Sequence, residues 1–408
     1  MELKMNYQYT YFIHPFIIKE SKYQKYILSL LKDKRFELKV FKKGKDFELY
    51  KHFSPKMREF LFSSFSHSKL KLDKLEELPD DTKSAILSKY PCTIFECKLE
   101  EDVQGKAEDK GIFFKVQKIE VICFNTGICF FSMKTNIEDS QNFSDILNFN
   151  YKFRDIKQGN TLNSYDKIYL QTSTFSDVNK LTEFIKNITG SDIETMKLDI
   201  DTQNFLTYSY VCIDSEAWNA NKRFEDIEYN FIKYANFLPA DNSADLELNE
   251  TTTFSEWKYA KMGFSKQGVV LFASSCDINN FTDLPNKFEN EYFYTYILNL
   301  YKKIYLKKLE VEFRDSSNIK IARKKFTEFT KNVWVQDITD DEIGSNINYR
   351  LSKVLELDRL YYEIKTKYDV LYKELNIEKN YKANIVVAII LVLSLILNIL
   401  NYIELMSH

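Results

Sequence analysis

The sequence predicts an α+β domain, then a long helical stalk, then one C-terminal transmembrane helix. Three observations lead to this fold class. Strand-like runs and turns alternate with helical patterns up to about residue 290. Long helical patterns follow from Asn290. The chain from Ala383 to Ile403 is uncharged over twenty-one residues, and at about 1.5 Å per residue such a helix spans roughly the 30 Å of a bilayer core.

Changes of pattern divide the chain into four parts. Residues 1–240 are expected to form a cytosolic α+β domain, and 241–289 a linker and a second β-hairpin unit that completes it. Residues 290–382 form the long-helix stalk, and 383–405 the transmembrane helix. Asp241–Thr253 is acidic and polar with little periodicity, which is typical of a linker.

The clearest local signal is a β-hairpin. Ile112–Phe124 and Ile128–Met133 are rich in apolar residues and are joined by an Asn-Thr-Gly turn. A similar run with a turn glycine lies at Lys266–Phe272, and the two runs are followed by the cap-like sequences Asn142–Asp145 and Asn280–Asp283. A duplicated hairpin-plus-helix unit and two unrelated hairpins both explain this pattern.

Composition and short motifs argue against several classes of function. A net charge of −2 gives no general attraction to nucleic acid, so no direct nucleic-acid binding is expected. The six cysteines include no Cys-x-x-Cys pair and no histidine at ligand spacing, so we predict no metal site. An even number of cysteines allows disulfides, but no N-terminal signal peptide is recognisable, so we expect reduced thiols. No Gly-x-Gly-x-x-Gly sequence or phosphate loop is present, which argues against a parallel Rossmann sheet, and the sequence identifies no cofactor.

The distribution of charge predicts the orientation of the span. Lysines precede it and none follows it, so the positive-inside rule places residues 1–382 in the cytoplasm. These are Lys365, Lys367, Lys373, Lys379 and Lys382. We therefore expect a single-pass protein of the cell inner membrane, with membrane lipid as a partner.

The helix that begins the stalk has one apolar face. Its residues are Phe293, Ile297, Leu300, Ile304 and Leu309. The lysines between them, Lys302, Lys303, Lys307 and Lys308, are expected to face solvent, with contact to acidic lipid headgroups as the alternative.

A second helix is predicted to start with a capping box, Thr339 and Glu342, and to continue unbroken to the membrane. Its apolar residues follow a heptad spacing from Val354 on. The residues of this stalk seam are Ile347, Val354, Leu357, Tyr361, Ile364, Tyr368, Leu371 and Leu375. Either the seam forms a coiled coil between copies of the chain, or it docks on the Phe293–Leu309 helix of the same chain.

Polar residues of the span lie on one side of the predicted helix. Asn384, Leu391 and Asn398 recur every seven residues, and Ser394 and Asn401 occupy the adjoining position. Because polar groups facing lipid are costly, we expect this stripe to face other helices or water. Asparagine amides that bridge packed helices, a water-filled lumen with Leu391 as a constriction, and a monomeric anchor are the three interpretations.

This layout from about Asn290 onward resembles the CorA-like magnesium channel family. The resemblance implies a homo-oligomer in which a stalk helix continues into the pore-lining segment. The family's Gly-Met-Asn signature is absent, and one span is present where the family has two. The resemblance therefore implies assembly but not selective Mg²⁺ transport. CorA-like and other membrane-inserted proteins also act as effectors of bacterial anti-phage defence, and this role is an expectation by analogy.

One set of residues suggests an enzyme. Pro79-Asp80 and Glu96-Cys97-Lys98 resemble the Pro-Asp…Glu-x-Lys pattern of restriction-like nucleases, in which carboxylates hold a divalent metal. A helix cap at Asp80 and ordinary strand-end charges explain the same residues. His14, His52 and His67 have no partners in a recognisable catalytic motif, so no catalytic residue is assigned.

The sequence as a whole favours a non-enzymatic, C-terminally anchored membrane protein that self-associates through stalk and span. Its cytosolic domain is expected to sense a small molecule or nucleotide and, in the strongest form of the hypothesis, to gate an ion channel. A membrane-tethered, metal-dependent nuclease and a non-conducting scaffold are the alternatives.

Overall fold

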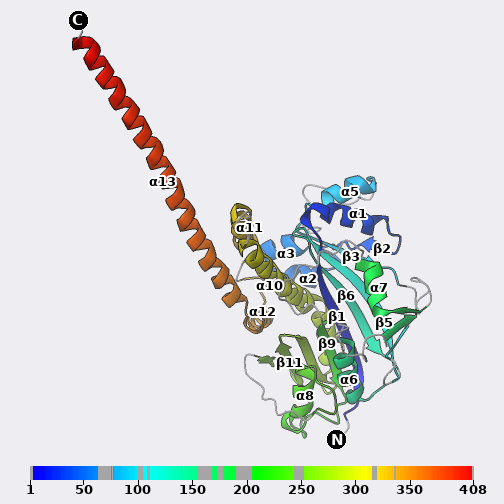
Figure 1. Cartoon of the computed structure of the whole chain (residues 1–408). Helices are drawn as coiled ribbons and strands as arrows, with labels where there is room; N and C mark the ends of the chain where they lie inside the picture. Colours follow the sequence, from blue (N-terminus) through cyan, green and yellow to red (C-terminus); the bar gives the residue numbers. More distant parts are fainter. Residues whose placement is uncertain are drawn as a thin grey trace.

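The computed structural model describes the chain in twelve stretches: 3–62, 75, 77–99, 104–107, 111–138, 140–154, 168–171, 178–189, 205–242, 252–314, 319–334 and 337–406. In these residues one twelve-stranded sheet is covered by helices on both faces. A long C-terminal helix projects away from this three-layer body (Figure 1).

The sheet is mixed and continuous. Its main path runs β10 (Thr253–Phe254), β11 (Ala260–Ser265), β12 (Gly268–Ser274), β9 (Leu206–Ile213), β1 (Met5–Ile17), β6 (Ile128–Ile137), β5 (Ile112–Phe124), β4 (Gln104–Ala107), β7 (Ile168–Gln171) and β8 (Val178–Lys180). β3 (Cys92–Cys97) pairs with β5 and with β2 (Phe36–Leu38). β12 and β9 run parallel, and the other pairs are antiparallel. Strands from both sides of the predicted linker therefore share one sheet, while 243–251 of that linker lie outside the described residues.

Alternation along the central strand β1 creates two cores. Tyr9, Tyr11 and Ile13 point to one face, and Phe12 and Phe16 to the other, because successive side chains of a strand lie on opposite sides. We call these the α10 face and the α6 face, after the helices that cover them.

Helices of the described ranges cover the α6 face. They are α1 (Tyr23–Lys32), α5 (Asp80–Leu87), α6 (Phe143–Arg154), α7 (Leu181–Thr189) and α8 (Glu228–Ala235). The α10 face carries α2 (Phe47–His52), α3 (Pro55–Leu61), α9 (Asp283–Lys287), the π-helical turn η8 (Phe288–Tyr292), α10 (Phe293–Arg314), α11 (Ile319–Asn332), α12 (Glu342–Val354) and the base of α13 (Leu357–Met406). The first part of the predicted stalk is thus packed against the sheet.

Both predicted hairpins are present, as β5–β6 and β11–β12. Gly127 makes the first turn with a φ of 83°, a value that favours glycine. The surroundings of the hairpins differ, since β6 runs antiparallel to β1 whereas β12 runs parallel to β9. The helices that follow also differ: α6 covers one face and α9 the other. Duplication of the unit remains a prediction.

Two of the four lysines expected to face solvent are buried, so that expectation is wrong for them. Lys308 donates to Glu20 Oε1 at 2.8 Å and to the carbonyl of Thr126 at 2.7 Å. The ammonium of Lys302 lies 5.7 Å from the centre of the Trp334 ring. Hydrogen bonds and an aromatic face replace water around these charges, which a helical pattern alone does not predict.

The helix predicted to run unbroken from Thr339 is two helices. Glu356, with a φ of 58°, separates α12 from α13. The cap also differs from the prediction, because the side chain of Asp341 accepts from Gly344 N at 2.7 Å and caps α12. Thr339 instead accepts a hydrogen bond from Asp341 N at 3.0 Å.

Candidate functional site

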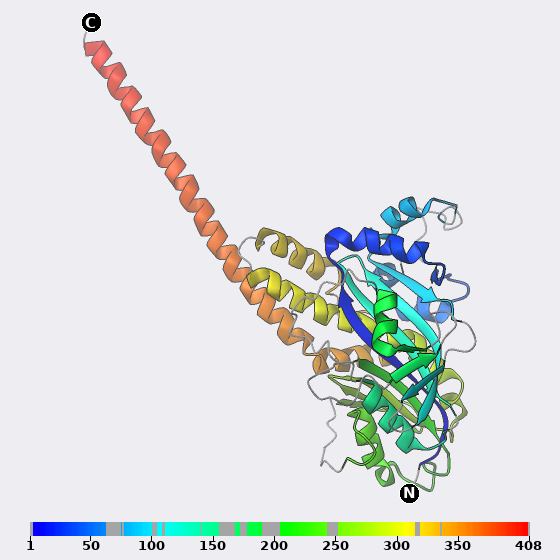
Figure 2. The same cartoon turned by 45° about the vertical axis from the view of Figure 1, so that its right-hand side comes forward.

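Helix α13 joins the domain core to an apolar segment. It has fifty residues, which at about 1.5 Å per residue make it about 75 Å long. Its segment Asn380–Leu400 is long and apolar enough to cross a membrane, and none of it is buried. Figures 1 and 2 show this segment projecting freely from the body.

The stalk seam packs within the chain. Ile347, Leu357, Tyr361 and Ile364 are buried in the core of the α10 face. Val354, Tyr368 and Leu371 are partly buried against the same core, whereas the side chain of Leu375 lies outside the described part. α13 contacts α10 directly, and Figure 2 shows the two helices side by side. This is the intrachain docking alternative of the sequence analysis.

Aromatic and charged contacts fix the base of α13. Tyr361 stacks on Trp334, with ring centroids 4.2 Å apart, and Phe326 of α11 lies 5.2 Å from the ring of Tyr368. Lys367 pairs with Glu310 of α10 at 2.9 Å. A movement of α13 therefore requires a movement of α10 and α11 or the loss of these contacts.

The predicted pore-lining residues lie on the free part of α13. Asn384, Leu391, Ser394 and Asn398 are all exposed, and the side chain of Asn401 lies outside the described part. Seven residues of an α-helix turn through nearly two full revolutions, so the stripe follows one side of the helix with a slow drift. No described residue of the same chain packs against it.

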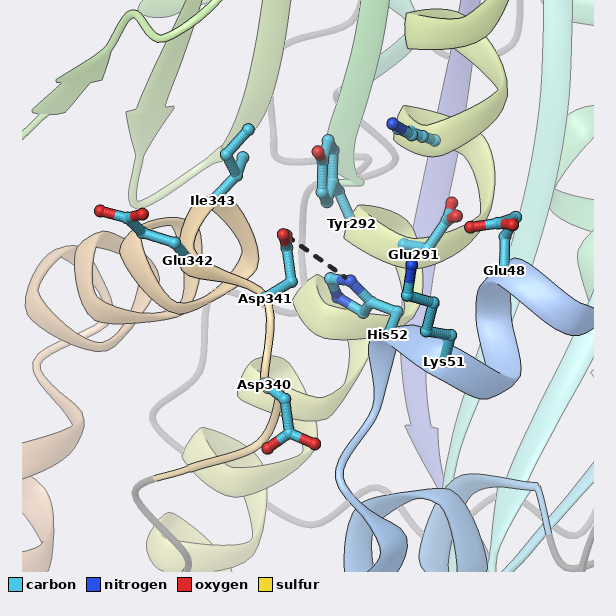
Figure 3. Close-up of a pocket in the computed structure, with 10 residues that line it drawn as sticks. Glu48, Lys51, His52, Glu291, Tyr292, Asp340, Asp341, Glu342 and Ile343 are labelled. Atoms are coloured by element: carbon cyan, nitrogen blue, oxygen red, sulfur yellow. Dashed lines mark ion pairs between the residues drawn. The ribbon is translucent and has the colours of Figure 1, made fainter.

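A polar pocket lies where α12 begins. It has a volume of about 440 Å³ and lies between α2, the α9–η8 segment and the start of α12 (Figure 3). Its lining residues are Glu48, Lys51, His52, Lys287, Glu291, Tyr292, Asp340, Asp341, Glu342 and Ile343. Five carboxyl groups and two lysines make the pocket acidic.

His52 is a buried residue of the pocket lining. Its Nε2 lies 3.3 Å from the hydroxyl of Thr295, and its Nδ1 lies 4.0 Å from Asp341 Oδ2. Burial lowers the pKa of His52 to about 4, against a weaker opposing effect of Asp341. The imidazole is therefore neutral near pH 7 and does not neutralise the carboxylate of Asp341.

Glu291 contributes a buried carboxyl group. It lies in η8, and the residue is 6% exposed. Burial raises its pKa to about 7. A hydrogen bond from its own backbone N–H and the charge of Lys287 lower this pKa only partly. The ammonium of Lys287 pairs with Asp283 at 3.0 Å.

Sequence reasoning missed this pocket. The acidic run Asp340–Glu342 is visible in the sequence, and His52 was noted as an isolated histidine. About 240 residues separate His52 from Glu291, and only the sheet and α10 bring them together. A one-turn π-helix, which is frequent at functional sites, has no clear sequence signature.

The nuclease-like residues are not brought together. Asp80 begins α5 on the α6 face, whereas Glu96 of β3 points to the α10 face and lies 3.8 Å from Lys39. Lys98 pairs with Glu37 at the surface, at 3.4 Å. In the part of the chain that the structure describes, no group of three or more His, Cys, Asp or Glu residues could hold a metal ion. His67 lies outside that part, and His14 is partly buried, which lowers its pKa to about 4.

No family model, curated protein or solved structure matches this chain. Its function must therefore be inferred from α13 and from the pocket at the start of α12.

Proposed function

We propose that this chain is a single-pass membrane protein that self-associates through the free part of α13 and whose α+β domain gates a pore between the assembled helices. One observation carries the proposal: α13 is a single helix with its base in the domain core and its far half apolar and exposed. In water an exposed apolar helix of this length would aggregate, so lipid is its expected environment.

The lysines that precede the span favour a cytoplasmic domain at the inner membrane. The domain would lie close to the bilayer surface, since few residues separate Leu371, packed on the core, from Asn380 at the start of the apolar segment. Membrane lipid and further copies of the chain are the partners that follow.

Self-association would use the polar stripe. The seam up to Leu371 already packs within the chain, which leaves the stripe of Asn384, Ser394 and Asn398 free for other copies. Side-chain amides that hydrogen-bond between membrane helices contribute about 0.6–2 kcal/mol each. A bundle of enough copies would turn these amides toward a lumen, with Leu391 as a constriction.

The same helix offers a route for gating. Tyr361 and Tyr368 hold the base of α13 against Trp334 and α11, so a change in the packing of this face would tilt or rotate the membrane segment. This is the kind of assembly that the CorA-like resemblance implies, without Mg²⁺ selectivity.

The experiment compares Asn398→Leu with Ile396→Leu. Asn398 lies on the stripe, and Ile396 lies two residues away, on roughly the opposite side of the helix. The full chain is purified in detergent for light scattering and reconstituted into planar bilayers for current measurement. We expect an oligomer with a measurable current from the wild type and from Ile396→Leu, and reduced assembly or current from Asn398→Leu.

Two results would contradict the proposal. A monomeric wild type in several detergents would exclude self-association. An oligomer that carries no current under any tested condition would exclude the pore and favour a non-conducting scaffold.

A further inference from the structure

The pocket at the start of α12 holds more negative charge than its own residues neutralise. Of its two lysines, Lys287 pairs with Asp283 outside the pocket lining, and the Lys51 side chain is exposed. His52 is neutral near pH 7. The five carboxyl groups that line this space therefore outnumber its two lysine ammonium groups (Figure 3).

Glu291 is the residue that points to a ligand. More than nine-tenths of it is buried, and it lines the pocket. Its carboxylate accepts a hydrogen bond from its own backbone N–H and feels the charge of Lys287, but among the described residues no salt bridge to it is formed. A buried acid without a salt-bridge partner is costly, and binding sites are places where such a cost is retained.

The geometry points to a binding site for a small organic cation, an ammonium or guanidinium compound, held by Glu291 and Asp341 against the ring of Tyr292. The volume of about 440 Å³ is that of a small-molecule site. An aromatic face beside two carboxylates suits an organic cation, since the ring attracts the positive charge through its π electrons. A bare metal ion fits less well, because no group of three or more ligating residues is close enough in the described chain.

Binding would be linked to the protonation of Glu291. Its pKa of about 7 means that the carboxyl group carries a proton part of the time at neutral pH. A bound cation favours the carboxylate, so the proton is released to the buffer. Calorimetry in two buffers of different ionisation enthalpy would show this release.

The position of the pocket makes the ligand a candidate trigger. A ligand there contacts α2, η8 and the first turn of α12 at once. α12 is followed by Glu356 and then by α13, so a bound cation would tie the base of the membrane helix to the sheet domain. This role in gating rests on the proposed function, whereas binding itself does not.

The test uses the full chain in nanodiscs of zwitterionic phosphatidylcholine, which has no anionic lipid to compete for amines. Spermidine, putrescine, L-arginine and MgCl₂ are titrated separately by calorimetry. We expect one site per chain for at least one of the organic cations, and about tenfold weaker binding in Glu291→Gln, since a charged hydrogen-bonded pair is lost. Asp341→Asn should also weaken binding while keeping the helix cap, because asparagine caps helices as well as aspartate does.

Glu328→Gln is the matched control. Glu328 is an exposed residue of α11 outside the pocket lining, so this variant should bind as the wild type does. Thermal unfolding of each variant shows whether it is folded.

Equal affinity in folded Glu291→Gln and wild type would overturn the inference. So would a binding heat that appears only in the MgCl₂ titration, or the lack of a binding heat with all four probes. Binding by a chain that stays monomeric would refute the proposed function and leave the ligand site standing. An oligomeric, conducting chain that binds none of the cations would refute the ligand site and leave the proposed function standing.

Discussion

The indole of Trp334 stacks on the ring of Tyr361, with centroids 4.2 Å apart and planes inclined by 2°. Trp334 follows α11, and Tyr361 lies one turn into α13. This stack joins the core of the α10 face to the helix that carries the apolar segment. It is the contact whose loss should release the base of α13 most directly.

Trp334→Ala tests this attachment. Trp334 is partly buried, so the loss of its ring contacts should cost about 2 kcal/mol of unfolding free energy. Hydrogen exchange should accelerate in 357–371, because the first turns of α13 lose their support. The measurement is urea unfolding of the full chain in detergent, together with exchange mass spectrometry. Tyr362→Ala is the control, since Tyr362 is 62% exposed, and equal exchange in both variants would contradict the role of the stack.

Gly344→Ala should destabilise the chain although alanine favours helices. A Cβ at Gly344 would lie 2.5 Å from His52 Cε1 and 2.9 Å from Thr339 Cγ2. The overlap should cost about 1–3 kcal/mol, more than the gain of about 1 kcal/mol from helix propensity. Thermal unfolding of the full chain in detergent measures the change.

His52→Ala supplies the second arm of this test. Removing the imidazole opens the space, so the cost of Gly344→Ala should be smaller in the His52→Ala background. Gly44→Ala is the control, because nothing lies within 4 Å of a Cβ at that position. Additive effects of the two substitutions would contradict the contact.

Glu291 should make stability fall as pH rises. Burial raises its pKa from its ordinary value of 4.5 to about 7, so its stabilising contribution is full below pH 4.5 and is lost as pH rises through 7. Glu291→Gln removes this dependence. The variant should therefore gain stability relative to the wild type between pH 5 and pH 8, on the order of 2 kcal/mol.

His52 acts in the opposite direction in both proteins. Its lowered pKa gives a contribution that is present above pH 6.5 and lost as pH falls through about 4. The contribution of His52 largely cancels when the unfolding free energy of the wild type is subtracted from that of Glu291→Gln. This difference in unfolding free energy is therefore the quantity to measure. The other charged groups that line the pocket are Glu48 and Lys51 on α2, Lys287 on α9, and Asp340, Asp341 and Glu342 at the start of α12. Asp283 of α9 also raises the pKa of Glu291. A stability difference that does not change with pH would show that Glu291 titrates as an exposed acid does.

The apolar segment and the first hairpin could be predicted from the sequence because both depend on residues that are neighbours in the chain. Uncharged residues at 383–403 fix a helix long enough for a bilayer, and the turn at Gly127 fixes the pairing of the strands around it. The α+β class, the later helices and the heptad seam follow from the same local periodicity.

Tertiary structure decided what those elements contact. Periodicity marks Tyr361 and Ile364 as buried but does not say whether the covering helices belong to the same chain. Here the base of α13 packs on α10 of the same chain, and Phe326 and Trp334 contact Tyr361. The sequence predicts that Lys302 and Lys308 face solvent, but the fold places Trp334 beside Lys302 and Glu20 beside Lys308. The pocket is lined by His52, Glu291 and Asp341, which are far apart in the sequence. The order in which strands and helices pack brings them together, and no single stretch of the chain determines that order.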